Sequence, residues 1–207
     1  MAQSLPLERR DLVVRRADVK SVRWKNGLGV TSELAVWPSG TSMERLDFDW
    51  RISAANVDAA GPFSEFRGYD RILTITSGPG MRLDHGPYAA GAELRRMQPY
   101  QFSGDWPTVA QLVGDGVTDF NVICRRGRVR ADVEPISIGQ ERLRRTASAA
   151  HSFLHVCRGT VRIEWDPDRH VVSLDAGDSF WRQRAESTEV EIMAHGEAAD
   201  LLLVSLG

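Results

Sequence analysis

Residues 71–83 read RILTITSGPGMRL, a strand-like run that stops at a turn and then resumes. Its first half is rich in β-branched residues, and residues 77–80 form a Ser-Gly-Pro-Gly turn signal. Residues 152–163, SFLHVCRGTVRI, repeat this order of strand, glycine-containing turn and strand. A further strand and a Gly-Asp pair follow each copy, Gly104-Asp105 after the first and Gly177-Asp178 after the second. Two copies of this pattern predict two small jelly-roll barrels.

Period-two alternation continues on both sides of these copies. In residues 48–54, Phe48, Trp50 and Ile52 share one face, while Arg51 and Ser53 share the other. Other short strand-like runs are separated by turn residues at intervals of roughly 8–12 residues, which is typical of an all-β sandwich or barrel. These runs cover residues 118–124, 129–133, 170–174, 190–193 and 201–204. Helix signal is poor, and the charged window 138–150 has no sustained apolar stripe, so we expect a loop there with at most one helical turn.

These patterns predict an all-β protein with little helix and two barrels. We expect residues 1–125 to form the first barrel and residues 126–207 the second, packed together as one compact unit. No Pro- or Ser-rich linker separates the two halves. Exposed strand edges commonly pair, which is compatible with a homodimer and leaves the oligomeric state open.

Composition excludes several classes of protein. The chain has 207 residues, of which 42% are hydrophobic and 26% charged, so a folded globular protein is expected rather than a disordered one. A formal net charge of −2 argues against a broad surface for nucleic acid or anionic membranes. The N-terminal residues lack the apolar core of a signal peptide, and no apolar run approaches the length of a membrane span. We therefore expect a cytoplasmic protein.

Motifs for metals, cofactors and nucleophiles are missing. The two cysteines, Cys124 and Cys157, lack CxxC spacing and end apolar runs, which predicts buried free thiols. His151 and His155 lie about 13 Å apart in an extended strand, too far to share an ion. The sequence contains no phosphate-binding loop, dinucleotide-binding fingerprint or nucleophile elbow. We expect neither a metal nor a cofactor.

Residues 24–33, WKNGLGVTSE, form the first of four segments with candidate binding residues. Their glycines let a backbone approach a ligand closely. Trp24 would supply an apolar wall, and Lys25 and Asn26 would supply hydrogen-bond donors. The alternative is a well-packed hairpin turn with a solvated lysine.

Residues 50–56 and 61–71 form the second and third segments. If the polar face of residues 50–56 lines a barrel mouth, Arg51 and Ser53 would contact a ligand there. The planar guanidinium of Arg51 would then suit a carboxylate. If that face is solvated, Arg51 is an ordinary strand residue. The other segment interleaves aromatic, glycine and charged residues before a strand and includes Phe63, Ser64 and Arg71, although a packed crossover would look similar.

Residues 119–126, DFNVICRR, form the fourth segment. Asp119, Asn121 and Arg125 share one face of this run with Ile123. An acid, an amide and a cation aligned in this way suit a polar pocket, and they also suit a solvated edge strand.

Together the four segments resemble the HutD/Ves family in order and spacing. The matching stretches are WKNGLGVTSELA (24–35), FDWRISAANV (48–57), GPFSEFRGYDRILTITSGPGMRL (61–83), FSGD (102–105) and DFNVICRR (119–126). The resemblance implies a cupin-like, RmlC-type double barrel, or bicupin. It also implies a bacterial, cytoplasmic protein tied to histidine utilisation, regarded as a regulator of histidine catabolism without a firmly assigned activity. One departure is Leu28, where the family usually has a third consecutive glycine.

The resemblance and the residue patterns lead to one functional hypothesis. The segments would converge on a pocket in the first barrel that binds a small anionic metabolite such as urocanate or formylglutamate, with no catalytic residue assigned. The expected ligand-binding residues are Trp24, Lys25, Asn26, Arg51, Ser53, Phe63, Ser64, Arg71, Asp119, Asn121 and Arg125. One alternative is a metal-independent isomerase or hydrolase that uses Asp119 and Glu33 for acid–base chemistry. Another is a protein-binding module that uses the basic residues 138–146.

Overall fold

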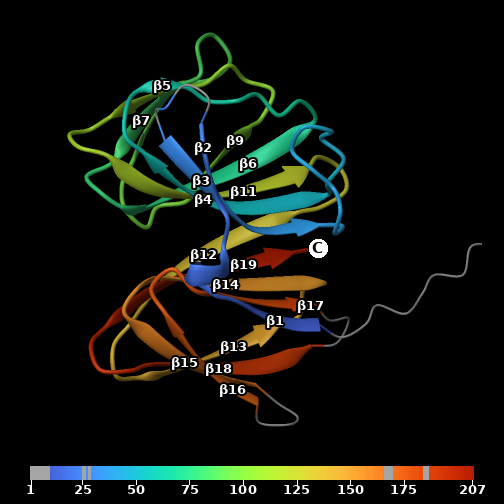
Figure 1. Ribbon diagram of the computed structural model, residues 1–207, viewed down its shortest axis with the longest axis vertical. Coiled ribbons are helices and arrows are strands. Elements are labelled where there is room, and N and C mark those ends of the chain that lie inside the picture. Colours follow the sequence, from blue (N-terminus) through green and yellow to red (C-terminus); the bar gives the residue numbers. More distant parts are fainter. Residues whose placement is uncertain (1–9, 25–26, 28, 166–169, 184–186) are drawn as a thin grey trace, which may run out of the picture. The chain divides into compact units, whose positions relative to one another are not determined.

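The computed structural model describes residues 10–24, 27, 29–165, 170–183 and 187–207, and these residues form two compact units (Figure 1). One unit comprises residues 19–131, and the other combines residues 10–18 with residues 132–207. Apart from one 3-10 turn, η1 (Arg16–Asp18), the regular elements of the described chain are strands, so the prediction of an all-β fold is confirmed. None of the described helical segments is long and apolar enough to cross a membrane.

Residues 19–131 form a barrel from two antiparallel sheets. Within the described residues, the larger sheet has the order β2-β3-β4-β11-β6-β9 and the smaller β5-β10-β7-β8. The strands are β2 (Ser21–Arg23), β3 (Gly29–Trp37), β4 (Trp50–Val57), β5 (Gly61–Pro62), β6 (Tyr69–Ser77), β7 (Met81–Asp84), β8 (Ala92–Leu94), β9 (Tyr100–Ser103), β10 (Val109–Leu112) and β11 (Val117–Arg125). We call this unit the first barrel.

Residues 10–18 and 132–207, the second barrel, repeat the same strand order. In the described residues β12-β19-β14-β17-β1 form one sheet and β13-β18-β15-β16 the other, so β4-β11-β6-β9 corresponds to β12-β19-β14-β17. The strands are β1 (Arg10–Val14), β12 (Ala131–Ile138), β13 (Arg142–Ala147), β14 (His151–Arg158), β15 (Thr160–Trp165), β16 (His170–Asp175), β17 (Ser179–Gln183), β18 (Thr188–Ala194) and β19 (Ala199–Leu206).

The internal repeat therefore holds for the two strand–turn–strand copies, which become β6–β7 and β14–β15. Their turn glycines are required, because Gly78 has φ +95° and Gly159 has φ +81°, in the left-handed region that favours glycine. The two Gly-Asp pairs are not equivalent, however. Gly104-Asp105 follows β9, whereas Gly177-Asp178 precedes β17.

Each barrel closes around its own apolar core. In the first barrel, Leu73 and Ile75 of the larger sheet belong to the same buried cluster as Met81 and Leu83 of the smaller sheet. In the second barrel a separate cluster combines residues of β12, β14, β17 and β19 with residues of β15, β16 and β18. The two sheets of each unit thus face each other across a packed interior.

The chain is divided differently from the expected boundary at residue 125. Strand β1, near the start of the chain, pairs antiparallel with β17 and places Leu12 opposite Trp181. Asp178 fixes the segment after β1, since its carboxylate accepts hydrogen bonds from the backbone N–H of Arg16 at 2.9 Å and from Arg15 Nη1 at 2.6 Å. Residues 10–18 therefore belong to the second barrel.

The expected loop at residues 138–150 is also corrected, because β13 runs through it and pairs with β18. Leu143 and Ala147 pack against the core of the second barrel. Arg142 and Arg144 point outward, and both form ion pairs with Glu191, at 2.8 and 3.0 Å. The apolar side of this strand is too short to produce a clear alternation in the sequence.

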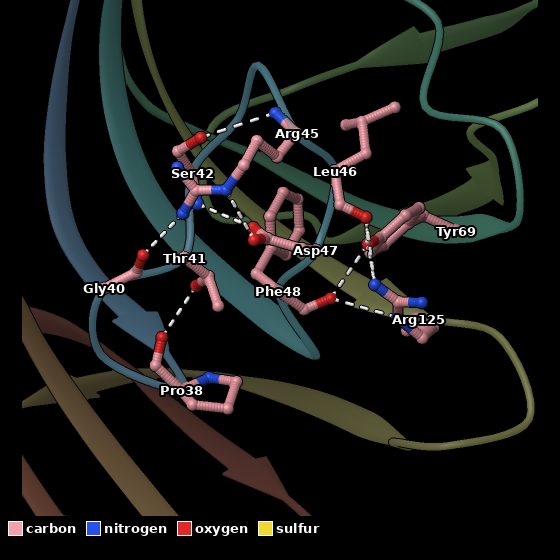
Figure 2. A network of polar contacts seen from close by, with 10 residues as sticks. All are labelled: Pro38, Gly40, Thr41, Ser42, Arg45, Leu46, Asp47, Phe48, Tyr69 and Arg125. Atoms are coloured by element: carbon pink, nitrogen blue, oxygen red, sulfur yellow. Dashed lines mark hydrogen bonds and ion pairs between the residues drawn. The ribbon is translucent and has the colours of Figure 1, made fainter.

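A network of polar contacts holds residues 38–48 against the first barrel (Figure 2). Leu46 has φ +49°, an uncommon conformation for a residue with a side chain. Its carbonyl accepts hydrogen bonds from Arg125 Nη2 at 2.9 Å and from the Tyr69 hydroxyl at 2.7 Å. The Tyr69 hydroxyl also lies 2.8 Å from the Phe48 carbonyl oxygen, and it accepts a hydrogen bond from Arg125 Nη2. The two side chains thus hold the loop by its backbone carbonyls.

Replacing Tyr69 with phenylalanine should destabilise the protein by about 1–3 kcal/mol, because buried carbonyls lose a donor. Denaturant unfolding measures this free energy. The matched control is Tyr88→Phe, since Tyr88 is 59% exposed and its change should stay within about 0.5 kcal/mol. Equal effects of the two substitutions would contradict the role given to the Tyr69 hydroxyl.

Candidate functional site

Three neighbouring strands of the first barrel bring five of the predicted site residues onto one face. Strand β11 lies between β4 and β6, and Asn121 is paired with Ser53 while Ile123 is paired with both Arg51 and Arg71. Residues paired across antiparallel strands point to the same side. Leu73 and Ile75, on this same face of β6, belong to the core cluster. The face is therefore the barrel interior, and the residues gathered on it are Arg51, Ser53, Arg71, Asp119 and Asn121, each at most 9% exposed.

Arg71 is surrounded by aromatic rings. Its guanidinium carbon lies 5.0 Å from the ring centroid of Phe102, 5.1 Å from that of Phe63 and 5.3 Å from that of Phe66. Nη1 donates a hydrogen bond to the Ser64 carbonyl at 3.3 Å, while Nε is buried and has no partner among the described residues. Burial lowers the pKa of Arg71 to about 10, so the group is a cation at neutral pH.

Arg51 already has an anionic partner. Its Nε donates to Glu33 Oε2 at 2.7 Å, and its Nη1 donates to Ser53 Oγ at 3.1 Å. The Glu33 side chain is 45% exposed and reaches the ion pair from strand β3. Arg51 and Arg71 stand two strands apart, on either side of Ile123, which separates their backbones by about 10 Å.

Asp119 and Asn121 line the same interior. Burial raises the pKa of Asp119 to about 7, although the nearby Arg71 cation acts in the opposite direction. Near neutral pH the carboxyl group is therefore protonated in part of the molecules and only partly neutralises Arg71. The Oδ1 atom of Asn121 is buried and has no hydrogen-bond partner within the described part of the chain. The face thus carries a buried donor and a buried acceptor that the described residues leave unsatisfied.

The aromatic residues predicted for the site lie at this interior. Trp24 packs against the core cluster, and its Nε1 donates to Thr31 Oγ1 at 2.7 Å. Phe63 packs against the same cluster and contacts Arg71. Ser64 is exposed and contributes its backbone carbonyl to Arg71, so the expectation that its side chain binds is not supported by this geometry.

The other predicted residues do not join this group. Arg125 lies beyond Ile123 at the end of β11, and its guanidinium donates to the carbonyls of Leu46 and Phe48 (Figure 2). It holds the 38–48 loop and does not face the interior. Lys25 and Asn26 lie outside the described residues.

His85 is a feature of the interior that the sequence interpretation missed. It is fully buried, with Nδ1 2.9 Å from Thr108 Oγ1 and Nε2 3.1 Å from the Tyr100 hydroxyl. Its ring lies 5.1 Å from the Phe102 ring and 5.3 Å from the Trp106 ring. Burial lowers the pKa of His85; the Arg71 cation acts in the same direction and Asp84 acts against it.

The donor set of this interior suits an anion better than a metal ion. Among the described residues, no three His, Cys, Asp or Glu side chains gather as metal ligands. Two guanidinium groups face the interior beside Asp119, and their positive charge disfavours a further cation. A carboxylate, in contrast, matches guanidinium geometry.

Replacing Asp119 with asparagine should change how stability depends on pH. The native pKa of about 7 lies above the unfolded value, so this group favours folding at low pH and loses that contribution as the pH rises through 7. The variant should therefore gain stability relative to wild type as the pH rises from about 4 to 7, by at most about 1.4 kcal/mol per pH unit. Denaturant unfolding of both proteins across this pH range measures the difference between their free energies of unfolding. The contributions of the other titrating groups cancel in that difference. Parallel curves for the two proteins would contradict the prediction.

Comparison with known proteins agrees with this architecture. The family model described as HutD matches residues 16–199. An uncharacterized 21.2 kDa protein in the hutC 3′ region of Pseudomonas putida is 37% identical over 145 residues, covering 68% of this chain and 72% of the relative. Protein Ves of Cronobacter sakazakii is 30% identical over 175 residues, covering 84% of this chain and 88% of the relative.

Solved structures show the same fold. A conserved Pseudomonas aeruginosa PAO1 protein of unknown function has a TM-score of 0.86 and 32% identity, covering 95% of this chain and 98% of its own. HutD from Pseudomonas fluorescens SBW25 has a TM-score of 0.79 and 26% identity over the same shares. Oxalate decarboxylase from Lactobacillus farciminis, at a TM-score of 0.68 and 8% identity over 94% of this chain and 85% of its own, shares the fold alone. The cupin-like double barrel is thus confirmed, and the chain belongs to the HutD family.

Proposed function

We propose that the first barrel binds a small anionic metabolite of histidine breakdown, and that the protein regulates histidine utilisation through this binding without catalysis. The observation that carries the proposal is Arg71, a buried cation with an unsatisfied Nε among the described residues. Burying a charge without a partner is costly, and Asp119 neutralises it only in part. A ligand carboxylate would complete the site.

The arrangement of charge and rings favours a urocanate-like ligand over a formylglutamate-like one. Glu33 neutralises Arg51, so one cation remains to be matched rather than two. Phe63 and Phe102 supply flat apolar surface near that cation, and a planar, conjugated monocarboxylate could stack on it. The Asn121 amide would fix the orientation of the ligand.

The relatives support the pathway. One relative is described by its position in the hutC 3′ region, and one solved neighbour is named HutD. These names support a role in histidine utilisation. We propose in addition that this role is regulatory. A regulatory role needs a binding site for the metabolite but no catalytic residues.

Arg71→Met should weaken urocanate binding by at least about tenfold, because a charge-assisted hydrogen bond contributes about 1.5–3 kcal/mol. Arg51→Ala should weaken it as well, because it leaves the Glu33 carboxylate beside the site without its cation. Isothermal titration calorimetry with urocanate and formylglutamate measures both affinities. Arg95→Met is the control, because its side chain is 72% exposed. Thermal unfolding reports whether each variant is folded. If both buried variants bind every intermediate as wild type does, the site is wrongly assigned.

The competing function is a metal-independent enzyme in which Asp119, with its raised pKa, acts as the acid or base. Incubation of wild-type protein with urocanate and formylglutamate, followed by chromatography, distinguishes the two functions. We expect both compounds to be recovered unchanged. Steady turnover that Asp119→Asn abolishes would replace the regulatory proposal with the enzymatic one.

A further inference from the structure

Asp119 occupies a position that holds a leucine in the second barrel. Asp119 of β11 is paired with Ile75 of β6. In the equivalent strands of the second barrel, Leu201 of β19 is paired with Val156 of β14. Ile75 and Val156 each lie three residues before the turn glycine of their strand–turn–strand copy. Leu201 is fully buried in the core cluster of the second barrel, so the fold does not require an acid at this position.

A shared β-bulge supports this equivalence. The register between β6 and β11 shifts between Thr118 and Asp119, and Thr76 is the extra residue on β6. The register between β14 and β19 shifts at the same place, with Cys157 as the extra residue. Bulges are common beside active sites, where they re-aim a side chain. Since both barrels have this bulge, the acid beside it is what distinguishes the first barrel.

Asn121 follows the same rule as Asp119. It is paired with Leu73, and its counterpart Leu203 is paired with Leu154. Leu203 packs against the core cluster of the second barrel, whereas the buried Oδ1 of Asn121 has no hydrogen-bond partner among the described residues. The first barrel thus has an acid and an amide where the second has two leucines. Burying such groups is costly, and a bound ligand would offset the cost.

Arg71 is the charged group that acts most directly on Asp119. It does so through space, since these two described side chains share no hydrogen bond or ion pair. Arg96 lies beside Ile75, but its side chain is exposed. The other charged or titratable side chains that the described strands bring to this interior are Arg51 of β4 with its partner Glu33 of β3, His85 after β7 and Tyr100 of β9.

A bound carboxylate would change the balance at Asp119. In the free protein the charge of Arg71 favours the ionised carboxyl group, while burial favours the protonated one. A ligand carboxylate that pairs with Arg71 would neutralise this cation and bring a like charge close to Asp119. Both changes favour the protonated form, which can also donate a hydrogen bond to the ligand.

We propose that the first barrel binds its anionic ligand together with a proton, which Asp119 takes up from solvent as the ligand carboxylate pairs with Arg71. With this proton the described charges of the interior balance, because Arg51 pairs with Glu33 and Arg71 pairs with the ligand. Without it the interior would hold an uncompensated negative charge, which is costly. The inference rests on the proposed function and adds that the affinity of the site depends on pH.

Binding of the anion should therefore weaken as the pH rises. The pKa of Asp119 in the free protein is about 7, so above this value each ligand must bring a proton from solvent. The affinity for urocanate should fall by up to about tenfold per pH unit between about pH 7.5 and 8.5. Arg71 stays charged in this range, because its pKa is about 10.

Isothermal titration calorimetry of the full-length protein with urocanate, at about pH 6.5, 7.5 and 8.5, tests the inference. Repeating the titration near pH 7.5 in buffers of different ionisation enthalpy counts the protons that bind with the ligand, and we expect about half to one. Titration of urocanate itself is the same with every variant and cancels in the comparison between proteins.

Three variants show whether Asp119 is the group that takes up the proton. Asp119→Asn should abolish the proton uptake and the pH dependence, and near pH 8.5 it should bind urocanate about tenfold more tightly than wild type does. Asp119→Leu, which copies the residue at position 201, should also lose the pH dependence. Asp115→Asn is the control, because Asp115 is exposed, and it should behave as wild type does.

The outcomes separate this inference from the proposed function. If wild type binds urocanate equally well from about pH 6.5 to 8.5, or if Asp119→Asn keeps the wild-type pH dependence, the inference is overturned and the proposed function stands. If neither urocanate nor formylglutamate binds at any of these pH values, the proposed function fails and the inference fails with it.

Discussion

The polar side chains on the inner face of the first barrel are largely buried, and this constraint decides how they behave. A guanidinium or carboxyl group on the inner face of β4, β11 and β6 must find a partner inside, change its protonation or remain unsatisfied. Arg51 has a partner in Glu33. Asp119 changes its protonation instead, with a pKa raised to about 7. The Nε of Arg71 and the Oδ1 of Asn121 remain without a hydrogen-bond partner within the described chain. The proposed ligand follows from this shortage of partners.

Much of the fold could be predicted because strand alternation is a local property of the sequence. Phe48, Trp50 and Ile52 are fully buried as expected, and both strand–turn–strand copies hold. Alternation could not show whether Arg51 faced solvent or a barrel interior, since both produce the same pattern. It also could not reveal the partner of β1, because pairing with β17 joins segments at opposite ends of the chain and leaves no local signal.

The site could be predicted where the family motifs and the alternation of side chains along a strand pointed to the same residues. These residues are Arg51, Ser53, Arg71, Asp119 and Asn121. Alternation failed for Arg125, which shares the face of Asn121 but lies past Ile123, where backbone carbonyls of another segment accept its hydrogen bonds. His85 was missed because the residues that follow it signal a turn. Its side chain nevertheless continues the inward face of β7, and only the three-dimensional structure places it beside Tyr100 and Phe102.

The path of the chain has a consequence for biosynthesis. Residues 19–131 are contiguous, so the first barrel can fold as soon as they leave the ribosome, whereas the second needs a strand made at the start and strands made at the end. Until β17 (residues 179–183) has been made, β1 has no edge to dock on. A fragment that begins after the first barrel would leave the β17 edge uncovered, and an open edge of this kind invites intermolecular strand pairing.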